Sequence, residues 1–309
     1  MLFCFGLGYS AQHYVKDFGH AQGRIAGTVR NPDHAAQLSR MGFGGESVEA
    51  LAFDGTASTP GIDALLAATD RLLVSVPPDE DGDPVLRHYG EALIAAPQLQ
   101  SIVYLSTVGV YGDHGGAWVD EDTEPRPIAE RSEARLAAER AWAALAGRAG
   151  KALAIFRLSG IYGPGRNALL QVASGSAKRI LKPGQVFNRI HVADIAAAIA
   201  AAFARRAAGI FNVTDDEPTP PGVPIEFAAG LIGVPPPPEV PFADVAPTMG
   251  DMARSFYAEC KRVRNARIKD TLGVRLAYPT YREGLRALFA AGEGSAPSSA
   301  VRQPSGAPR

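Results

Sequence analysis

The first eleven residues of the chain, Met1-Leu-Phe-Cys-Phe-Gly-Leu-Gly-Tyr-Ser-Ala11, decide how the N-terminal half folds. The apolar run from Met1 to Phe5 predicts a buried strand, and a helical pattern follows it. Between the two, Gly6 permits a tight turn, Gly8 lets the backbone approach a pyrophosphate, and Ala11 keeps the helix close to the strand. The helix N-terminus adds free amides and a positive dipole. The stretch therefore predicts a dinucleotide-binding loop; the alternative is a tight turn without a ligand.

Short apolar runs and longer helical patterns alternate along the next part of the chain, as far as residue 158. Strict alternation predicts parallel strands joined by right-handed crossovers, which is a doubly wound α/β sheet. The expected strands are 1–5, 24–29, 49–53, 71–76, 100–105 and 152–158, and the expected helices are 10–18, 34–41, 62–68, 84–96 and 128–146.

The alternation breaks after Ile161. A helix is expected over 192–203 and a late strand over 209–213, followed by proline-rich connectors and helices over 224–231 and 281–289. This pattern predicts a parallel nucleotide-binding sheet with a smaller, discontinuous C-terminal substrate domain. The expected division is 1–160 plus about 191–213 for the first domain, 161–190 and 214–290 for the second, and a disordered tail over 291–309.

The composition limits the range of functions. With 31 basic and 32 acidic residues the formal net charge is -1, so nothing draws the whole chain toward nucleic acid or an acidic membrane. Two cysteines, with Cys4 in an apolar run, indicate no disulfide framework and favour a reducing, cytoplasmic location. We expect no membrane span and, because no ligand spacing such as paired CxxC occurs, no metal site.

Polar residues follow several of the predicted strands at the edge where a cofactor would lie. Arg30 follows the second strand, where a carboxylate would bind a ribose hydroxyl, and it can instead pair with a 2′-phosphate. NADP is therefore favoured over NAD, the alternative being a surface arginine. Asp54 can accept from an adenine amine or simply form a turn. The residues expected to contact the cofactor are Gly6, Gly8, Tyr9, Ser10, Ala11, Arg30, Asp54, Ser75, Val76, Pro77, Ser106 and Arg135.

Four later stretches resemble motifs of the extended short-chain dehydrogenase/reductase family. They are Tyr104-Leu-Ser-Thr-Val-Gly-Val-Tyr-Gly112, Arg157-Leu-Ser-Gly-Ile-Tyr-Gly-Pro-Gly165, Arg189-Ile-His-Val-Ala-Asp-Ile-Ala196 and Lys261-Arg-Val-Arg-Asn265. With the glycine loop, the resemblance covers about residues 1–290. It implies a Rossmann domain with a C-terminal substrate domain, NAD(P) binding, and epimerase, dehydratase or reductase chemistry on sugar-nucleotides or other alcohols and carbonyls.

The resemblance also implies a catalytic set, and this chain departs from it. Thr107 matches the Ser/Thr that polarises the substrate oxygen. The family's Tyr-x-x-x-Lys pair would fall on Arg131 and Arg135. Arginine cannot donate a proton near neutral pH because its pKa exceeds about 12. Arg131 could instead hold an anionic substrate group and Arg135 a ribose or phosphate, or both could pair with Glu130, Glu133 or Glu139 on a solvated helix.

Other side chains could complete the site. Tyr111 could supply a phenol, although in the family it is usually structural, and His114 lies in a glycine-rich loop expected to cover the crevice. Arg189 and Asn167 are anion-binding or substrate candidates from the second domain. His191 and Asp194 resemble a structural turn of the family in which the carboxylate caps the next helix.

Three readings of the function follow from these residues. In the first, the protein is an NADP(H)-dependent oxidoreductase with a non-standard proton relay, acting on a small alcohol, carbonyl or sugar-nucleotide-like substrate, which is anionic if Arg131 binds it. In the second, it is a non-catalytic dinucleotide-binding redox sensor or scaffold. A fold that serves only protein contacts is a third reading and predicts no dinucleotide affinity. Family analogy suggests a homodimer.

Overall fold

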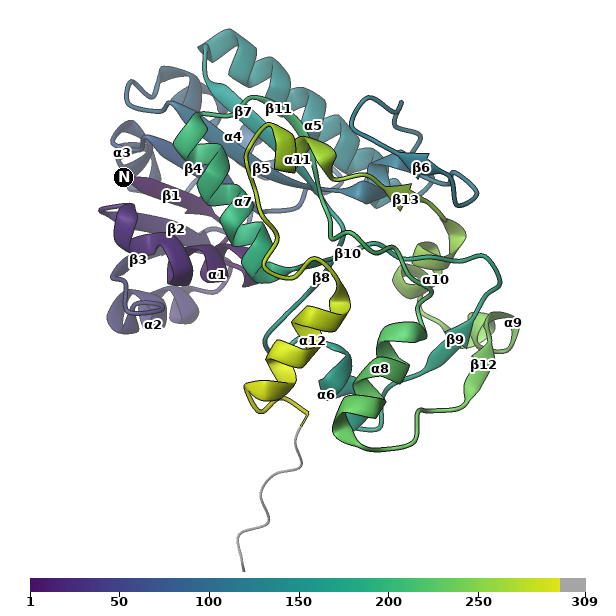
Figure 1. Cartoon of the computed structure of the whole chain (residues 1–309). Helices are drawn as coiled ribbons and strands as arrows, with labels where there is room; N and C mark the ends of the chain where they lie inside the picture. Colours follow the sequence, from purple (N-terminus) through teal and green to yellow (C-terminus); the bar gives the residue numbers. More distant parts are fainter. Residues whose placement is uncertain (295–309) are drawn as a thin grey trace, which may run out of the picture.

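The computed structural model describes residues 1–294, and its centre is one parallel sheet flanked by helices (Figure 1). The 7-stranded sheet has the order β11-β7-β5-β4-β1-β2-β3. Chain order reverses between β1 and β4, so the carboxyl ends of these two strands open the crevice in which doubly wound folds bind ligands. The strands are β1 (Leu2–Phe5), β2 (Ile25–Val29), β3 (Val48–Ala52), β4 (Arg71–Val74), β5 (Ser101–Thr107), β7 (Ala152–Leu158) and β11 (Gly209–Val213).

Each face of the sheet is covered by three helices that bury apolar side chains against it. On one face Tyr14, Ile199 and Phe203 pack with Cys4 and Phe156. On the other face Tyr89, Leu93, Trp142 and Leu145 pack with Phe5. The first layer consists of α1 (Tyr9–Phe18), α2 (Pro32–Met41) and α7 (Val192–Arg205), and the second of α3 (Ile62–Ala67), α4 (Pro84–Ala95) and α5 (Glu130–Ala149).

The structure confirms the predicted fold class, since every strand expected before residue 158 joins the same parallel sheet. The differences are at element ends. Strand β5 continues to Thr107 because it stays paired with β7 as far as Leu158. Helix α5 begins at Glu130 rather than Ile128, since Ala129 keeps an extended backbone as its N-cap.

The segments after residue 158, apart from α7, β11 and α11 (Ala266–Asp270), form a second group of elements that includes a core of its own. Tyr162, Leu169, Ala228, Tyr281 and Leu285 pack together there. The strands are β8 (Gly160–Tyr162), β9 (Arg179–Leu181), β10 (Arg189–His191), β12 (Glu239–Pro241) and β13 (Arg262–Val263), which pairs with β6 (Trp118–Val119). The helices are α6 (Ala168–Ala173), α8 (Val223–Ile232), α9 (Phe242–Val245), α10 (Asp251–Ala258) and α12 (Tyr281–Ala290). Helix α11 instead packs beside β11, with Ile268 in the core of the sheet.

The sequence predicted α7, β11, α8 and α12 but none of the short strands of this group. The domain division proposed from the sequence stays a prediction. The expected disordered tail falls mostly outside the described residues. Within residues 1–294, no helix has both the length and the apolarity required to cross a membrane.

Candidate functional site

The glycine loop between β1 and α1 has the shape that a pyrophosphate requires. Gly6 has φ +88, and an added Cβ would lie 2.7 Å from the Ser75 Oγ, so only glycine fits the turn. Thr28 holds the loop by accepting the Gly6 amide at 3.0 Å. By contrast, a Cβ on Gly8 would meet no atom within 4 Å. Gly8 is also the N-cap of α1 and makes no side-chain cap, which leaves the first helical amides available to an anion.

We expect Gly8→Val to abolish most dinucleotide binding while leaving the fold intact. The open space above Gly8 would accept the side chain, and its backbone has a negative φ that valine adopts. Stability should change by no more than about 1 kcal/mol, the scale of an N-cap substitution. Calorimetric titration with NADPH and a urea melt check both parts. If NADPH affinity is unchanged in a folded Gly8→Val protein, the loop is not the pyrophosphate site.

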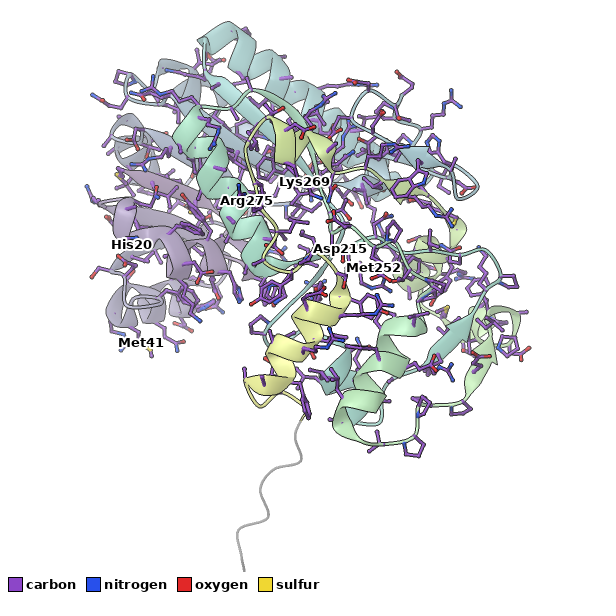
Figure 2. All side chains as sticks on the ribbon, in the orientation of Figure 1. His20, Met41, Asp215, Met252, Lys269 and Arg275 are labelled. Atoms are coloured by element: carbon purple, nitrogen blue, oxygen red, sulfur yellow. The ribbon has the colours of Figure 1, made fainter. Side chains whose placement is uncertain are left out.

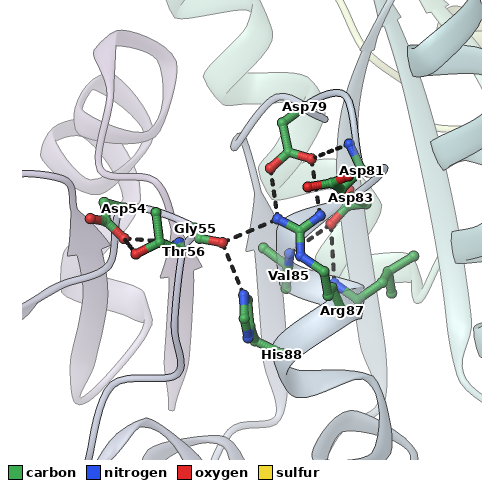
Figure 3. A network of polar contacts seen from close by, with 10 residues as sticks. Asp54, Gly55, Thr56, Asp79, Asp81, Asp83, Val85, Arg87 and His88 are labelled. Carbon is green, nitrogen blue, oxygen red and sulfur yellow. Dashed lines mark hydrogen bonds and ion pairs between the residues drawn. The ribbon is translucent and has the colours of Figure 1, made fainter.

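Two charged residues were predicted to contact the adenosine part of the cofactor, and their partners in the described range differ. Arg30 is exposed just after β2 and makes no ion pair with any residue in the described range. Asp54 accepts from the Thr56 amide and hydroxyl, which lowers the pKa of its carboxyl and gives it a turn-forming role. Arg87 and His88 hold the adjacent Gly55 carbonyl, as Figure 3 shows. Arg30 is therefore the group best placed to choose between two dinucleotides.

Residues after β4 and β5 differ in how accessible they are. The Ser75 hydroxyl donates to the Gly6 carbonyl at 2.6 Å and fixes the loop, whereas Val76 is partly exposed and Pro77 exposed. Ser106 is buried and its hydroxyl donates to Glu139, so its side chain faces the interior instead of a cofactor. This corrects the expectation that Ser106 touches the cofactor. The next residue, Thr107, is partly exposed at the end of β5.

Thr107 and Tyr111 have opposite environments. Thr107 ends β5 and is partly exposed; its Oγ1 accepts from the Gly109 amide at 3.1 Å, which leaves the hydroxyl proton free to donate. Tyr111 has no exposed surface, and its hydroxyl donates to Asn212 at 2.8 Å. The Arg157 guanidinium lies 4.8 Å from its ring centroid. Tyr111 therefore has a structural role, which corrects the idea that its phenol reaches a substrate.

The two arginines of α5 do not pair with the glutamates of their helix. Neither one forms an ion pair within the described part of the chain, and Glu139 is bound to Arg157. Arg135 donates to the Tyr104 hydroxyl at 3.1 Å and the Leu105 carbonyl at 3.0 Å. It therefore fastens α5 to β5, beside the crevice. The solvated ion-pair alternative is wrong.

Arg131 is exposed one turn nearer the helix N-terminus. Its guanidinium carbon lies 4.5 Å from the ring centroid of Phe256, which is on α10. Phe256 is 56% exposed and did not stand out in the sequence. An arginine on an aromatic ring keeps its edge donors, so Arg131 can still bind an anion.

Asn167 and His114 both make contacts that hold the fold together. Asn167 is buried, caps α6 by accepting from Leu169 and Leu170, and donates to Gly163, so it is structural and not a substrate ligand. His114 contacts the Tyr111 carbonyl at 3.1 Å, and its amide donates to Cys260. These contacts anchor the glycine-rich loop to the segment before β13.

The turn at the start of α7 differs from the prediction. His191 is the N-cap, since its Nδ1 accepts from the Ala193 amide at 3.2 Å, and burial lowers its pKa to about 4. Asp194 accepts instead from the amides of Ala277 and Tyr278, at 2.7 and 3.1 Å. The Asp194 capping prediction is therefore wrong: this carboxylate anchors the segment that leads into α12.

Asp215 and the pair Tyr257 and Lys261 were not predicted from the sequence. Asp215, just after β11, is 1% exposed, and its Oδ2 has no hydrogen-bond partner. Tyr257 and Lys261 have the Tyr-x-x-x-Lys spacing, but the Lys261 ammonium donates to the Gly112 carbonyl at 2.7 Å and anchors the same loop as His114. No local pattern distinguishes Asp215 from a turn-forming aspartate, whereas the Tyr257 spacing could have been found.

A parallel sheet with an open glycine loop at its reversal point, and a hydroxyl at the end of the neighbouring β5, defines a Rossmann-type protein of the short-chain dehydrogenase/reductase class. The family model described as "NAD dependent epimerase/dehydratase family" matches residues 90–214. The chain belongs to this family.

Among the proteins similar to this chain are the following three. A functionally unknown conserved protein from Silicibacter pomeroyi DSS is 47% identical, with TM-score 0.83 over 94% of this chain and 99% of that one. A putative NAD-dependent epimerase/dehydratase from Methylobacillus flagellatus is 26% identical, with TM-score 0.69 over 94% and 98%. The 3-diazoavenalumate denitrifying reductase of a Streptomyces species is 29% identical over 137 residues, 42% of this chain and only 45% of that protein.

Proposed function

We propose that the protein is an NADP(H)-dependent oxidoreductase that acts on a small anionic alcohol or carbonyl compound. The observation that carries the proposal is the open space above Gly8, next to unpaired α1 amides, at the edge of the sheet where the partly exposed Thr107 ends β5. Family membership supports a nicotinamide dinucleotide as cofactor, and the unpaired Arg30 favours the phosphorylated form. The curated reductase relative supports redox chemistry as the reaction class.

We assign each residue around the crevice a separate role in the reaction. The bound dinucleotide supplies or accepts a hydride at the substrate carbon. The Thr107 hydroxyl donates a hydrogen bond to the substrate oxygen, so that negative charge developing there is stabilised. No arginine can supply the proton, and Tyr111 is buried, so the proton reaches the oxygen from water through the Thr107 hydroxyl. Arg135 holds α5 against β5, and Arg131 keeps its edge donors free one turn nearer the helix N-terminus.

Titration with the four dinucleotides tests the cofactor half. We expect wild-type protein to bind NADPH more tightly than NADH, and Arg30→Ala to lose about 10- to 100-fold in NADPH affinity with NADH unchanged. A hydrogen-bonded charge pair with the 2′-phosphate is worth about 1.5–3 kcal/mol. Arg40→Ala, an exposed arginine at the other end of α2, is the matched control. No binding of any dinucleotide would overturn the proposal.

A non-catalytic NADP(H) sensor is the second candidate. The observation that favours it is the occupation of the proton-relay positions by Arg131 and Arg135, the second of which is tied to Leu105. Thr107→Val separates the two functions. An enzyme loses NADPH-dependent turnover on an active aldehyde or ketone, whereas a sensor has no turnover in either form and keeps the same dinucleotide affinity in both.

A further inference from the structure

Arg189 is a cation without a counter-ion. From β10 its Nη1 donates to the Thr219 Oγ1 at 2.7 Å and to the Phe187 carbonyl at 3.1 Å. Its Nε and Nη2 donate to no residue between 1 and 294, and it makes no ion pair in that range. Burial lowers the pKa of its guanidinium, although arginine remains charged at neutral pH. Arg189 is partly buried, and an unpaired charge in such a place is costly, so the site is suited to a negatively charged ligand.

Asp215 lies beside Arg189 but does not neutralise it. The Asp215 amide donates to the Arg189 carbonyl at 2.7 Å, which brings the two residues together. Its Oδ1 accepts from the Glu217 amide at 3.2 Å, and its Oδ2 is buried without a partner. Burial raises the pKa of this carboxyl to about 8, so at pH 7 it is mostly protonated. A neutral carboxylic acid offers a hydrogen-bond donor at Oδ2 rather than a negative charge.

The other groups around Arg189 are also donors or are already paired. The hydroxyls of Tyr257 and Tyr281 donate to no described residue, and both side chains lie within electrostatic reach of the guanidinium. Two nearby cations form ion pairs, Lys269 with Asp216 and Arg282 with Glu217, and the Lys182 ammonium donates to the Tyr257 carbonyl. The site therefore combines the uncompensated positive charge of Arg189 with several unused donors.

We infer that Arg189 and Asp215 bind a carboxylate group of the substrate, with the Arg189 guanidinium as the charge partner and the unpartnered Asp215 Oδ2 as a second contact. A carboxylate is a monoanion with two acceptor oxygens, which matches one positive charge and a set of donors. A phosphate monoester carries about -1.5 to -2 at pH 7 and would need a second free cation.

The position of this site agrees with the reaction centre proposed above. The register aligns Thr107 with Leu158 and Leu158 with Val213, and Asp215 follows two residues later. Strand spacing and rise then separate the Cα atoms of Thr107 and Asp215 by roughly 12 Å. Figure 2 shows Asp215 near the middle of the molecule, where the sheet meets the C-terminal helices. A keto acid or an aldehyde acid of a few carbons would reach from the Thr107 hydroxyl to the site formed by Arg189 and Asp215. This inference rests on the proposed oxidoreductase function, but the carboxylate site can be tested without turnover.

Benzoate is a suitable probe because it has a carboxylate and no reducible carbonyl. We expect calorimetry at pH 7 to show benzoate binding to the full chain, with affinity at least tenfold lower in Arg189→Gln and partly restored in Arg189→Lys. Arg275→Gln removes an exposed arginine without an ion pair and should bind as wild type does (labelled in Figure 2). Equal benzoate binding by Arg189→Gln and wild type, or no binding by wild type, would overturn the inference.

The pH dependence gives a second, independent readout. Above pH 8 the ionised Asp215 would compete for Arg189 and repel the ligand, so wild-type benzoate affinity should fall about tenfold between pH 7 and pH 9. Asp215→Asn should bind equally well at both values, and a fall of the same size in this variant would contradict the assignment. The charged and phenolic groups that face Asp215 or Arg189 are Asp216, Glu217, Tyr162, Tyr257 and Tyr281.

Two further titrations separate this inference from the proposed function. If inorganic phosphate binds through Arg189 more tightly than benzoate, the site takes phosphate and the carboxylate assignment is wrong. NADPH is titrated into the same variants. Arg189-dependent benzoate binding without NADPH binding would refute the oxidoreductase and leave the anion site standing, whereas NADPH binding with no effect of Arg189→Gln on benzoate would refute only the anion site.

Discussion

Replacing Glu139 with leucine is expected to lower the free energy of unfolding by about 3–5 kcal/mol. The Arg157–Glu139 ion pair is 2.7 Å long, and the two side chains are 2% and 3% exposed. Glu139 also accepts the Ser106 hydroxyl, and the Arg157 Nη1 has no partner even in the intact structure. Removing the carboxylate would leave a buried guanidinium with no counter-charge beside β5 and β7. Urea melts at pH 7 measure the loss.

Two variants separate the buried pair from a general effect of changing α5. Glu133→Leu, on the exposed side of the same helix, should stay within about 0.5 kcal/mol of wild type. The double variant Glu139→Leu with Arg157→Met should regain most of the stability lost by the single variant, because no unpaired charge remains. If Glu139→Leu alone melts within 1 kcal/mol of wild type, this ion pair does not hold α5 to the sheet.

The sequence was sufficient for the parts of the fold that depend on local patterns. The apolar run before Gly6, the turn at Gly8 and the alternation to residue 158 each act over a few residues, and parallel pairing follows from their order. The short strands β8 and β10 were not predicted, because three-residue elements carry too little periodicity. They depend on pairing between Gly160 and Arg189, which are far apart in the chain.

The site was harder to predict than the fold for the same physical reason. Spacing in α5 placed Arg131 and Arg135 on one face, but whether they met Glu139 depended on Arg157, which comes from another strand and binds it. Tyr111 and Asn167 are residue types that act in many sites, and only their burial and partners identified them as structural. Asp194 was misplaced because His191 already caps α7. In each case a long-range partner decided the role.

The second large predicted effect is a fall in the free energy of unfolding with rising pH, caused by Asp215. Burial raises the pKa of its carboxyl to about 8 in the folded protein, against an ordinary value of 3.8. Between those values the folded state holds a proton that the unfolded state has lost, so the free energy of unfolding falls as pH rises toward 8. The slope reaches about 1.4 kcal/mol per pH unit. From pH 6.5 to pH 8 we expect wild type to lose about 2 kcal/mol relative to Asp215→Asn, which has no proton to lose.

The range above pH 6.5 isolates Asp215 from the buried His191. The pKa of His191 is about 4 in the folded protein, so unfolding takes up a proton there only below about pH 6.5, where stability changes in the opposite direction. Urea melts of wild type, Asp215→Asn and the exposed control Asp63→Asn at pH 6.5, 7.2 and 8 measure the three slopes. Asp63→Asn should follow wild type. Parallel lines for wild type and Asp215→Asn would mean that Asp215 is ionised throughout, and Arg189 would then have a counter-charge and no need of an anionic ligand.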